Sequence, residues 1–299
     1  MSMVGIEEVA ARAGVSTATV SRALNDKSHV SKTARKKVFE AAEELGYVPS
    51  SSAYTLATGK TRTVGVVVPF VDRWFFSVVL QGISTALNDR GLNIAFYSLK
   101  GDLDQRARVF NDLLLRKNVD GVLTVAVKLA SHELEKLSSL RKSIVGVGGP
   151  ITGARSLGID DEGAGRLATQ HLLSLGHTKI GIITGGPSTE LEFHQPYLRQ
   201  TGYREALMDA GLDFQKNWFA EADFTMPGAY HAAKQILGDP RSAPTAIFCA
   251  SDEMAFGAIQ AAKDLGYSVP DDISVIGMDN HDLSGFYNFT TINQKPADQ

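Results

Sequence analysis

Near the start of the chain, short side chains have the types and spacing needed to contact DNA. A short helix expected from Ser16 to Leu24 places four residues on its outward face: Thr17, Ala18, Ser21 and Arg22. An arginine can donate two hydrogen bonds to guanine, and an alanine methyl can pack against the methyl group of thymine. Ser16, Asn25 and Ser31 carry polar groups suited to phosphate contacts. This face is therefore predicted to enter the major groove of DNA.

The elements around this face have a helix-turn-helix pattern. An apolar helical stripe leads into Gly14, which permits a tight turn. Val15 and Val20 are expected to be buried between the first two helices. A third helix is expected over 31–46, because a serine suits its start and a glycine its end. We therefore expect residues 1–48 to form an all-helical DNA-binding head.

Charge is divided unevenly along the chain. Residues 1–63 hold nine Lys or Arg and six Asp or Glu, a net charge of +3, so the remaining residues carry −6. A basic segment joined to an acidic body indicates that one end meets a polyanion. Residues 49–63 are too polar to form a core. They are predicted to be a linker, part of which could form a short helix.

Composition argues against several protein classes. The first twenty residues carry three charged side chains and no long apolar run, so a signal peptide is not expected. No uninterrupted apolar stretch of about 18 residues indicates a membrane span. The single cysteine, Cys249, cannot form an intrachain disulfide and is expected to be a small buried hydrophobe. We therefore expect a cytoplasmic protein.

From residue 64 onward, short apolar runs alternate with amphipathic helical stretches. The expected strands are 64–68, 94–97, 121–127, 144–147, 179–184, 246–250 and 273–278. This alternation predicts an α/β body with parallel sheets that are covered by helices on both faces. Ligands of such sheets bind beyond the carboxyl ends of the strands. The corresponding loops are 69–74, 148–153, 185–195, 251–253 and 279–283.

The head resembles that of the lactose repressor/galactose repressor family of transcription regulators. The matching segments are 6–25, His29-Val-Ser31 and Leu45-Gly-Tyr-Val-Pro49. The resemblance adds His29 to the predicted DNA contacts and implies a hinge helix that forms on operator DNA. By position, Leu56 would wedge into the minor groove and Ala53 would face the other copy of a dimer. Residues 50–52 are serines where the family usually has Asn and then Arg, so the hinge is expected to make fewer phosphate contacts.

Residues 64–299 resemble the regulatory body of the same family, which is like the periplasmic sugar-binding proteins. The landmarks are Phe75-Phe76, Gly82-Ile83, 175–180, Arg199, 202–204, Ser251-Asp252, 273–277, Asp279 and 290–292. The resemblance implies a two-lobed body with a ligand cleft, and a homodimer that reads a palindromic operator. The family usually continues with a further helix and strand after the position of Pro296, so the C-terminus is expected to be truncated.

Six residues of the body are predicted to hold a sugar-like effector: Asp72, Phe75, Arg199, Phe224, Ser251 and Asp279. The arginine can fork onto neighbouring hydroxyl oxygens, and Asp279 can accept two hydroxyl protons. The two phenylalanines can cover the apolar face of a sugar, and the other polar side chains offer further contacts. The loop 148–150 lacks the acidic pocket residue that many family members carry.

These assignments have structural alternatives. Arg199 or Asp279 could belong to a structural ion pair, and Phe224 could be a core residue. Asp72 could be a solvated loop carboxylate. Phe76 is predicted to be core.

Other function classes have weaker support in the sequence. The glycines of 146–150 and 185–187 lack the spacing of a dinucleotide loop and the lysine of a P-loop, and no His/Cys set has zinc spacing. The adjacent acids Asp160-Asp161 are expected to be solvated. We therefore expect no enzyme, cofactor or metal site, but a repressor of carbohydrate-utilisation genes that a small sugar releases from its operator. An activator, or a purine-type repressor that needs a corepressor, remains an alternative.

Overall fold

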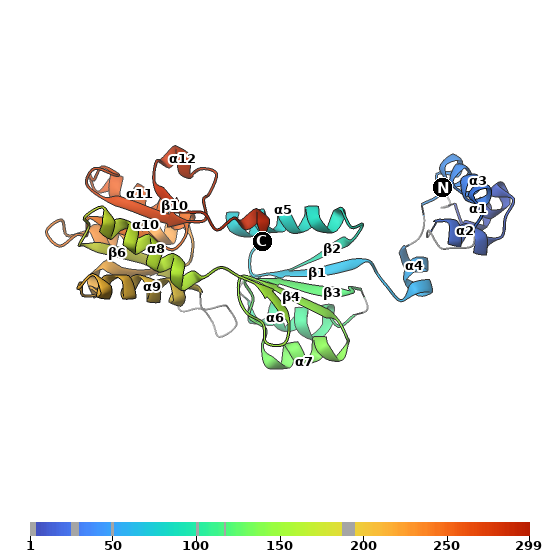
Figure 1. Cartoon of the computed structure of the whole chain (residues 1–299), viewed down its shortest axis with the longest axis horizontal. Helices are drawn as coiled ribbons and strands as arrows, with labels where there is room; N and C mark the ends of the chain where they lie inside the picture. The colour runs from blue at the N-terminus through green and yellow to red at the C-terminus, as the bar shows by residue number, and fades with distance from the viewer. Residues whose placement is uncertain (1–3, 25–29, 49–50, 100–101, 117, 187–194) are drawn as a thin grey trace. The chain divides into compact units, whose positions relative to one another are not determined.

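The computed structural model of the chain describes residues 4–24, 30–48, 51–99, 102–116, 118–186 and 195–299. The chain divides into two compact units, Met1–Thr61 and Arg62–Gln299 (Figure 1). Two of the predicted DNA-contacting residues, Asn25 and His29, lie outside the described residues, and so does the side chain of Ala53.

The first unit consists of short helices whose ends are fixed by local backbone chemistry. Its helices are α1 (Ile6–Ala13), α2 (Thr17–Leu24), α3 (Lys32–Leu45) and α4 (Ser51–Thr58). The Ser31 hydroxyl accepts a hydrogen bond from the amide of Ala34 at 3.1 Å and so caps α3. Gly14 and Gly46 end α1 and α3 at φ values of 66° and 62°, a left-handed conformation that glycine adopts without strain.

A small apolar core joins α1, α2 and α3. Val9, Val20 and Val38 contribute one fully buried side chain from each helix, and small alanines fill the space between them. Burying a side chain of this size stabilises a fold by about 1.5–3 kcal/mol. Val15 was expected to be buried but is half-buried at the edge of this core, because it lies in the turn before α2.

The second unit contains two lobes, each built on a parallel sheet. Lobe 1 comprises β1 (Thr63–Val68), α5 (Trp74–Asn88), β2 (Asn93–Ser98), α6 (Leu103–Arg108), the π-helix η1 (Val109–Leu113), β3 (Gly121–Val125), α7 (Ser131–Ser139), β4 (Ser143–Val147) and β5 (Arg155–Leu157). Its strand order is β2-β1-β3-β4-β5. Along β1, Val66 and Val68 pack with α5, whereas Val67 packs with η1 and α7 on the other face.

Lobe 2 has the same construction. It comprises α8 (Asp161–Ser174), β6 (Ile180–Gly185), α9 (Gln195–Asp209), η2 (Lys216–Trp218), β7 (Phe219–Ala222), α10 (Met226–Leu237), β8 (Ala246–Cys249), α11 (Asp252–Asp264), β9 (Ser274–Met278), α12 (Ser284–Tyr287) and β10 (Thr290–Ile292), and the 3-10 helix η3 (Pro296–Asp298) follows β10. The strand order is β10-β9-β8-β6-β7. In β8, Ile247 and Cys249 pack with α10 and α11, and Phe248 packs with α8 and α9. Cys249 is thus a buried apolar residue, as expected.

The chain joins the lobes at two places. It enters lobe 2 between β5 and α8, and after β10 it returns so that η3 lies against α5 (Figure 1). Gly82 of α5 makes this approach possible, because a Cβ atom there would lie 2.6 Å from the carbonyl oxygen of Ala297. These crossings place the carboxyl ends of the two sheets on either side of one cavity.

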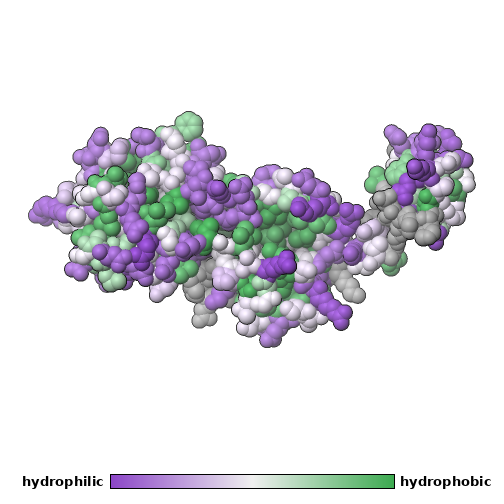
Figure 2. All heavy atoms as spheres, in the orientation of Figure 1, coloured by the Kyte–Doolittle hydropathy of each residue, from purple (hydrophilic) through white to green (hydrophobic). Residues whose placement is uncertain are grey.

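The surface of the molecule is mixed in character. On the face shown in Figure 2, hydrophilic side chains are interspersed with small apolar areas. Within the described ranges, none of the helices has the length and apolar character that crossing a bilayer requires.

Candidate functional site

The outward face of α2 carries the predicted base-contacting residues. Thr17, Ala18 and Arg22 are exposed, and Ser21 is half-buried. The opposite face of the helix is held in the core through Val20, so packing fixes which side chains point outward. This arrangement can bring the Arg22 guanidinium and the Ala18 methyl to base edges in a major groove.

The two serines predicted to contact phosphates also act as helix caps. The Ser16 hydroxyl accepts a hydrogen bond from the amide of Thr19 at 3.2 Å, and the Ser31 hydroxyl caps α3. A hydroxyl has one donor and two acceptor positions, so each serine could still donate to a phosphate. In α4, the side chain of Leu56 is 90% exposed and can reach a partner outside the chain.

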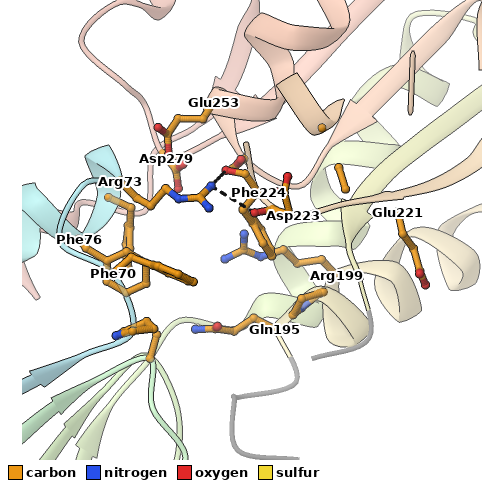
Figure 3. Close-up of a pocket in the computed structure, with 18 of the residues that line it drawn as sticks. Phe70, Arg73, Phe76, Gln195, Arg199, Glu221, Asp223, Phe224, Glu253 and Asp279 are labelled. Carbon is orange, nitrogen blue, oxygen red and sulfur yellow. Dashed lines mark hydrogen bonds between the residues drawn. The ribbon is translucent and has the colours of Figure 1, made fainter. Parts of the chain in front are cut away.

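A cavity of about 640 Å³ lies between the two lobes of the second unit. Its size is that of a small-molecule site, for which about 300–1,000 Å³ is typical. The residues that line it come from the β1–α5 loop, α5, the start of α9, the β7–α10 loop, the start of α11 and the segments after β9 and β10 (Figure 3). Five of the six predicted ligand residues are among them: Phe75, Arg199, Phe224, Ser251 and Asp279.

Arg199 is held in place by a buried ion pair. Its Nε and Nη2 atoms lie 2.8 Å from Asp161, and Nη1 donates to the carbonyl oxygen of Ala250 at 2.5 Å. Burial raises the pKa of Asp161, while the neighbouring guanidinium opposes this change. These contacts match the structural alternative for Arg199, although the side chain also lines the cavity and has further N–H donors.

Asp161 corrects an expectation from the sequence. The pair Asp160-Asp161 was expected to be solvated, but Asp161 is only 7% exposed and Asp160 caps α8 by accepting a hydrogen bond from Gly163. The two acids lie where lobe 1 passes into lobe 2, and the second one turns inward to meet Arg199. The sequence carried no signal that distinguished them.

The sequence predicts that Asp279 is a carboxylate that accepts two hydroxyl protons, and its buried position changes this expectation. It is 4% exposed, and its Oδ1 atom accepts a hydrogen bond from Gln294. Burial raises the pKa of Asp279 to about 8, and the nearby carboxylate of Asp252 contributes to the increase. Burial thus favours the neutral carboxyl, which can donate one hydrogen bond, over a carboxylate that only accepts.

Ser251 and Asp252 begin α11 at the back of the cavity. The Ser251 hydroxyl accepts from the amide of Met254 at 3.2 Å, so it caps the helix and keeps its proton for a ligand. Asp252 accepts from the Thr291 hydroxyl at 2.7 Å and from the amide of His281 at 2.8 Å. Burial raises the pKa of Asp252 to about 6. Asp252 thus fixes the loop after β9 that carries Asp279.

Aromatic rings form much of the apolar wall. Phe75 and Phe76 meet edge to face with ring centroids 5.4 Å apart, and Phe70 lies 6.4 Å from Phe76. Phe76, which was predicted to be core, packs against the apolar cluster beneath α5 and also lines the cavity. Phe224 likewise lines the cavity and packs against the core of lobe 2.

Asp72 does not take part in the cavity. Its side chain is exposed, and it is not among the residues that line the cavity. The solvated alternative therefore describes it, because the chain turns after β1 so that the neighbouring Arg73 points inward instead (Figure 3).

Several polar residues of the cavity were not identified from the sequence: Arg73, Gln195, Glu221, Asp223, Glu253 and Gln294. Arg73, Gln195 and Glu253 lie in loops that the strand pattern had marked, but their types alone did not distinguish them from surface residues. Gln195 donates to the carbonyl oxygen of Gly148 at 2.7 Å. Among the residues described, no three His, Cys, Asp or Glu side chains are grouped to hold a metal ion.

Comparisons with known proteins agree with this architecture. Residues 5–50 match the family described as bacterial regulatory proteins, lacI family, and residues 169–298 match the periplasmic binding protein-like domain. HTH-type transcriptional repressors named PurR from Aliivibrio salmonicida (strain LFI1238) and Aliivibrio fischeri (strain ATCC 700601 / ES114) are 35% and 36% identical. Each alignment covers 98% of this chain and 87% of the relative.

Solved structures of transcriptional regulators also match almost the whole chain. A lac repressor dimer bound to operator and the anti-inducer ONPF is 27% identical, with a TM-score of 0.86 over 99% of this chain and 89% of that chain. A complex of the transcriptional regulator CelR with cellobiose is 30% identical, with a TM-score of 0.69 over 98% of this chain and 89% of that chain. The chain therefore belongs to the lacI family of bacterial regulatory proteins and is a DNA-binding transcriptional repressor rather than an enzyme.

Proposed function

We propose that a neutral mono- or disaccharide, or a related polyol, binds between the lobes and lowers the affinity of this repressor for its operator. In this proposal residues 1–48 form the head that binds DNA, residues 49–63 form the hinge, and residues 64–299 form the regulatory body. The protein would act in the cytoplasm as a homodimer on a palindromic operator, because one head reads only a half-site.

The composition of the cavity wall carries this proposal. Aromatic rings offer an apolar surface, while Ser251, Asp279 and Gln294 offer donors and acceptors at one end. A sugar presents the matching pattern of an apolar face with hydroxyl groups around it. The two cations of the cavity, Arg73 and Arg199, are already engaged by acceptors of the protein. A ligand without a negative charge therefore suits the wall better than a phosphorylated one.

The neighbouring structures are compatible with this ligand class. The solved CelR structure contains cellobiose, and the lac repressor structure contains an anti-inducer together with operator DNA. A repressor of carbohydrate-utilisation genes that a sugar releases is the function that we infer from this combination.

A second candidate is a purine-type repressor that binds DNA only with its corepressor. The observation that favours it is the group of relatives named PurR, which align with 98% of the chain. Under this alternative, a nucleobase would stack on Phe224 or Phe75, and Asp279 would meet a ring nitrogen.

A thermal-shift screen separates the two candidates. The protein and its Asp279→Ala variant would be melted with neutral mono- and disaccharides, including cellobiose, and with free nucleobases. We expect a sugar to stabilise the wild type and to lose at least about tenfold in affinity in the variant, because an unpaired buried polar group costs about 1–3 kcal/mol. Stabilisation by a purine alone would establish the second candidate, and equal stabilisation of both proteins would place the sugar elsewhere.

A further inference from the structure

We propose that Arg73 is an interlobe latch: it reaches from lobe 1 across the effector cavity and holds the Phe224 loop of lobe 2, so that the lobes close before any ligand binds. The proposal concerns the regulation of the proposed effector site. It rests on the proposed function only in assuming that this cavity receives the effector.

The latch consists of hydrogen bonds from one lobe to the main chain of the other. Arg73 lies directly before α5, and its Nη1 atom donates to the carbonyl oxygens of Phe224 at 2.5 Å and Asp223 at 3.2 Å (Figure 3). The guanidinium carbon also lies 5.1 Å from the centre of the Phe70 ring, which supports the side chain from its own lobe. Both acceptors are backbone groups, so their direction is set by the fold of the β7–α10 loop.

That loop is built to present its carbonyl groups to the cavity. Phe224 has a φ of 57°, a left-handed conformation that costs a non-glycine residue free energy. The conformation is fixed on one side by Thr225, which caps α10 through a hydrogen bond from Gly228 at 3.0 Å. Arg73 binds it from the cavity side. The same contact thus positions the Phe224 ring that is predicted to cover the ligand.

A second interlobe contact lies beside the latch. The ring of Trp74 stacks on His281 of lobe 2, with centroids 4.5 Å apart and planes 24° apart. Asp252 holds the backbone of His281, as described above. Glu253, also in lobe 2, is half-buried and faces the positive charge of Arg73. Charge, stacking and hydrogen bonding therefore converge on the start of α5, which makes this point a closure contact of the cavity beside the hydrogen bond from Gln195 to Gly148.

The latch can be tested without knowing the effector, by measuring the distance between the lobes. Cysteines introduced by Glu135→Cys on α7 and Gln235→Cys on α10 are exposed positions for spin labels, and the native Cys249 is fully buried. Labelled chains are mixed with an excess of unlabelled protein, so that distances within one chain dominate. We expect one main distance with Arg73 present. In Arg73→Met, the ratio of closed to open chains should fall by about tenfold or more, because hydrogen bonds from a charged group are lost.

Two further variants make the result specific. Arg73→Lys keeps one charged donor and should restore part of the closed population. Arg90→Met is the matched control, because Arg90 lies just beyond the other end of α5 and donates to the carbonyl oxygen of Ala86 in its own lobe. The distances between the two labels in Arg90→Met should equal those of the wild type. If Arg73→Met does not fold, Arg73→Gln is used in its place.

The proposal is overturned if the Arg73 and Arg90 variants give the same distances as the wild type. This outcome is independent of the ligand screen, since no ligand is added. Failure of every sugar in that screen would remove the proposed effector but would leave the latch measurement unaffected.

Discussion

Buried carboxyl groups at the end of the cavity are expected to make the body of the repressor sensitive to pH. Asp279 is enclosed by lobe 2, and its raised pKa of about 8 means that folding keeps a proton on it. In the unfolded chain the same group ionises near its ordinary pKa of 3.8. Between these two values the native state binds more protons than the unfolded state, so the free energy of unfolding falls as the pH rises.

Asp279→Asn should therefore flatten this dependence. From about pH 5.5 to about pH 7.5, the wild type should lose of the order of 1 kcal/mol or more relative to the variant, since one pKa unit corresponds to about 1.4 kcal/mol. Thermal melts at both pH values measure the difference. The control is Asp271→Asn at an exposed position. Parallel pH profiles for the wild type and Asp279→Asn would show that the carboxyl is ionised in the folded protein.

The ion pair between Arg199 and Asp161 gives a second prediction for single residues. Asp161→Ala leaves a buried guanidinium without its carboxylate and should lower the free energy of unfolding by about 3–5 kcal/mol. Asp160→Ala, one residue earlier, removes only a helix cap and should cost about 1 kcal/mol. Chemical denaturation of the two variants compares them directly. Equal costs would mean that Arg199 does not depend on this pair.

At this scale the sequence predicted part of the site. Arg199, Ser251 and Asp279 were identified because they combine useful chemistry with a matched motif. Arg73 and Asp161 were missed. The role of Arg73 depends on how the loop between β1 and α5 turns, and the role of Asp161 depends on how the chain turns between β5 and α8. The type of a charged loop residue does not show whether its side chain faces water or a cavity.

At the scale of elements, α4 presents an exposed leucine that the fold does not use. Leu56→Ala should leave the melting temperature of the protein unchanged, because the side chain is 90% exposed. If the leucine wedges into the minor groove, the variant should bend operator DNA less and bind it more weakly. Energy transfer between dyes at the ends of an operator duplex reports the bend. A variant that bends DNA as strongly as the wild type would rule out the wedge.

The alternation of apolar runs and helices was sufficient to predict most of the elements. Seven expected strands appear. The inner strands β1, β6, β8 and β9 are largely buried and are therefore short continuous apolar runs. The strands β5, β7 and β10 and the helix α7 were missed. The first and last of these strands have three residues each at sheet edges, which is too short for a recognisable period, and α7 is a short helix of largely polar composition with few apolar residues to mark its inward face. The helical stretch expected between the strands 94–97 and 121–127 is α6 followed by a π-helix, a distinction that side-chain periodicity does not encode.

At the scale of the whole molecule, regulation requires that the cavity and the head share one equilibrium. A ligand can change operator affinity only by binding two states of the protein with different affinity. An open and a closed arrangement of the two lobes would be such states, and β1, which begins at Thr63, is the first strand after α4 of the hinge segment. Movement of lobe 1 against lobe 2 would therefore act on the strand that follows the hinge segment in the chain.

The most direct test is the affinity of the protein for its operator with and without the sugar found in the thermal-shift screen. The operator is the palindromic site that the protein selects from random DNA, and fluorescence anisotropy measures its binding. We predict that saturating sugar weakens operator binding at least about tenfold, a coupling free energy of about 1.4 kcal/mol. Asp279→Ala should abolish this effect, whereas Arg22→Ala should weaken operator binding in both conditions. A sugar that binds the cavity but leaves operator affinity unchanged would contradict the account.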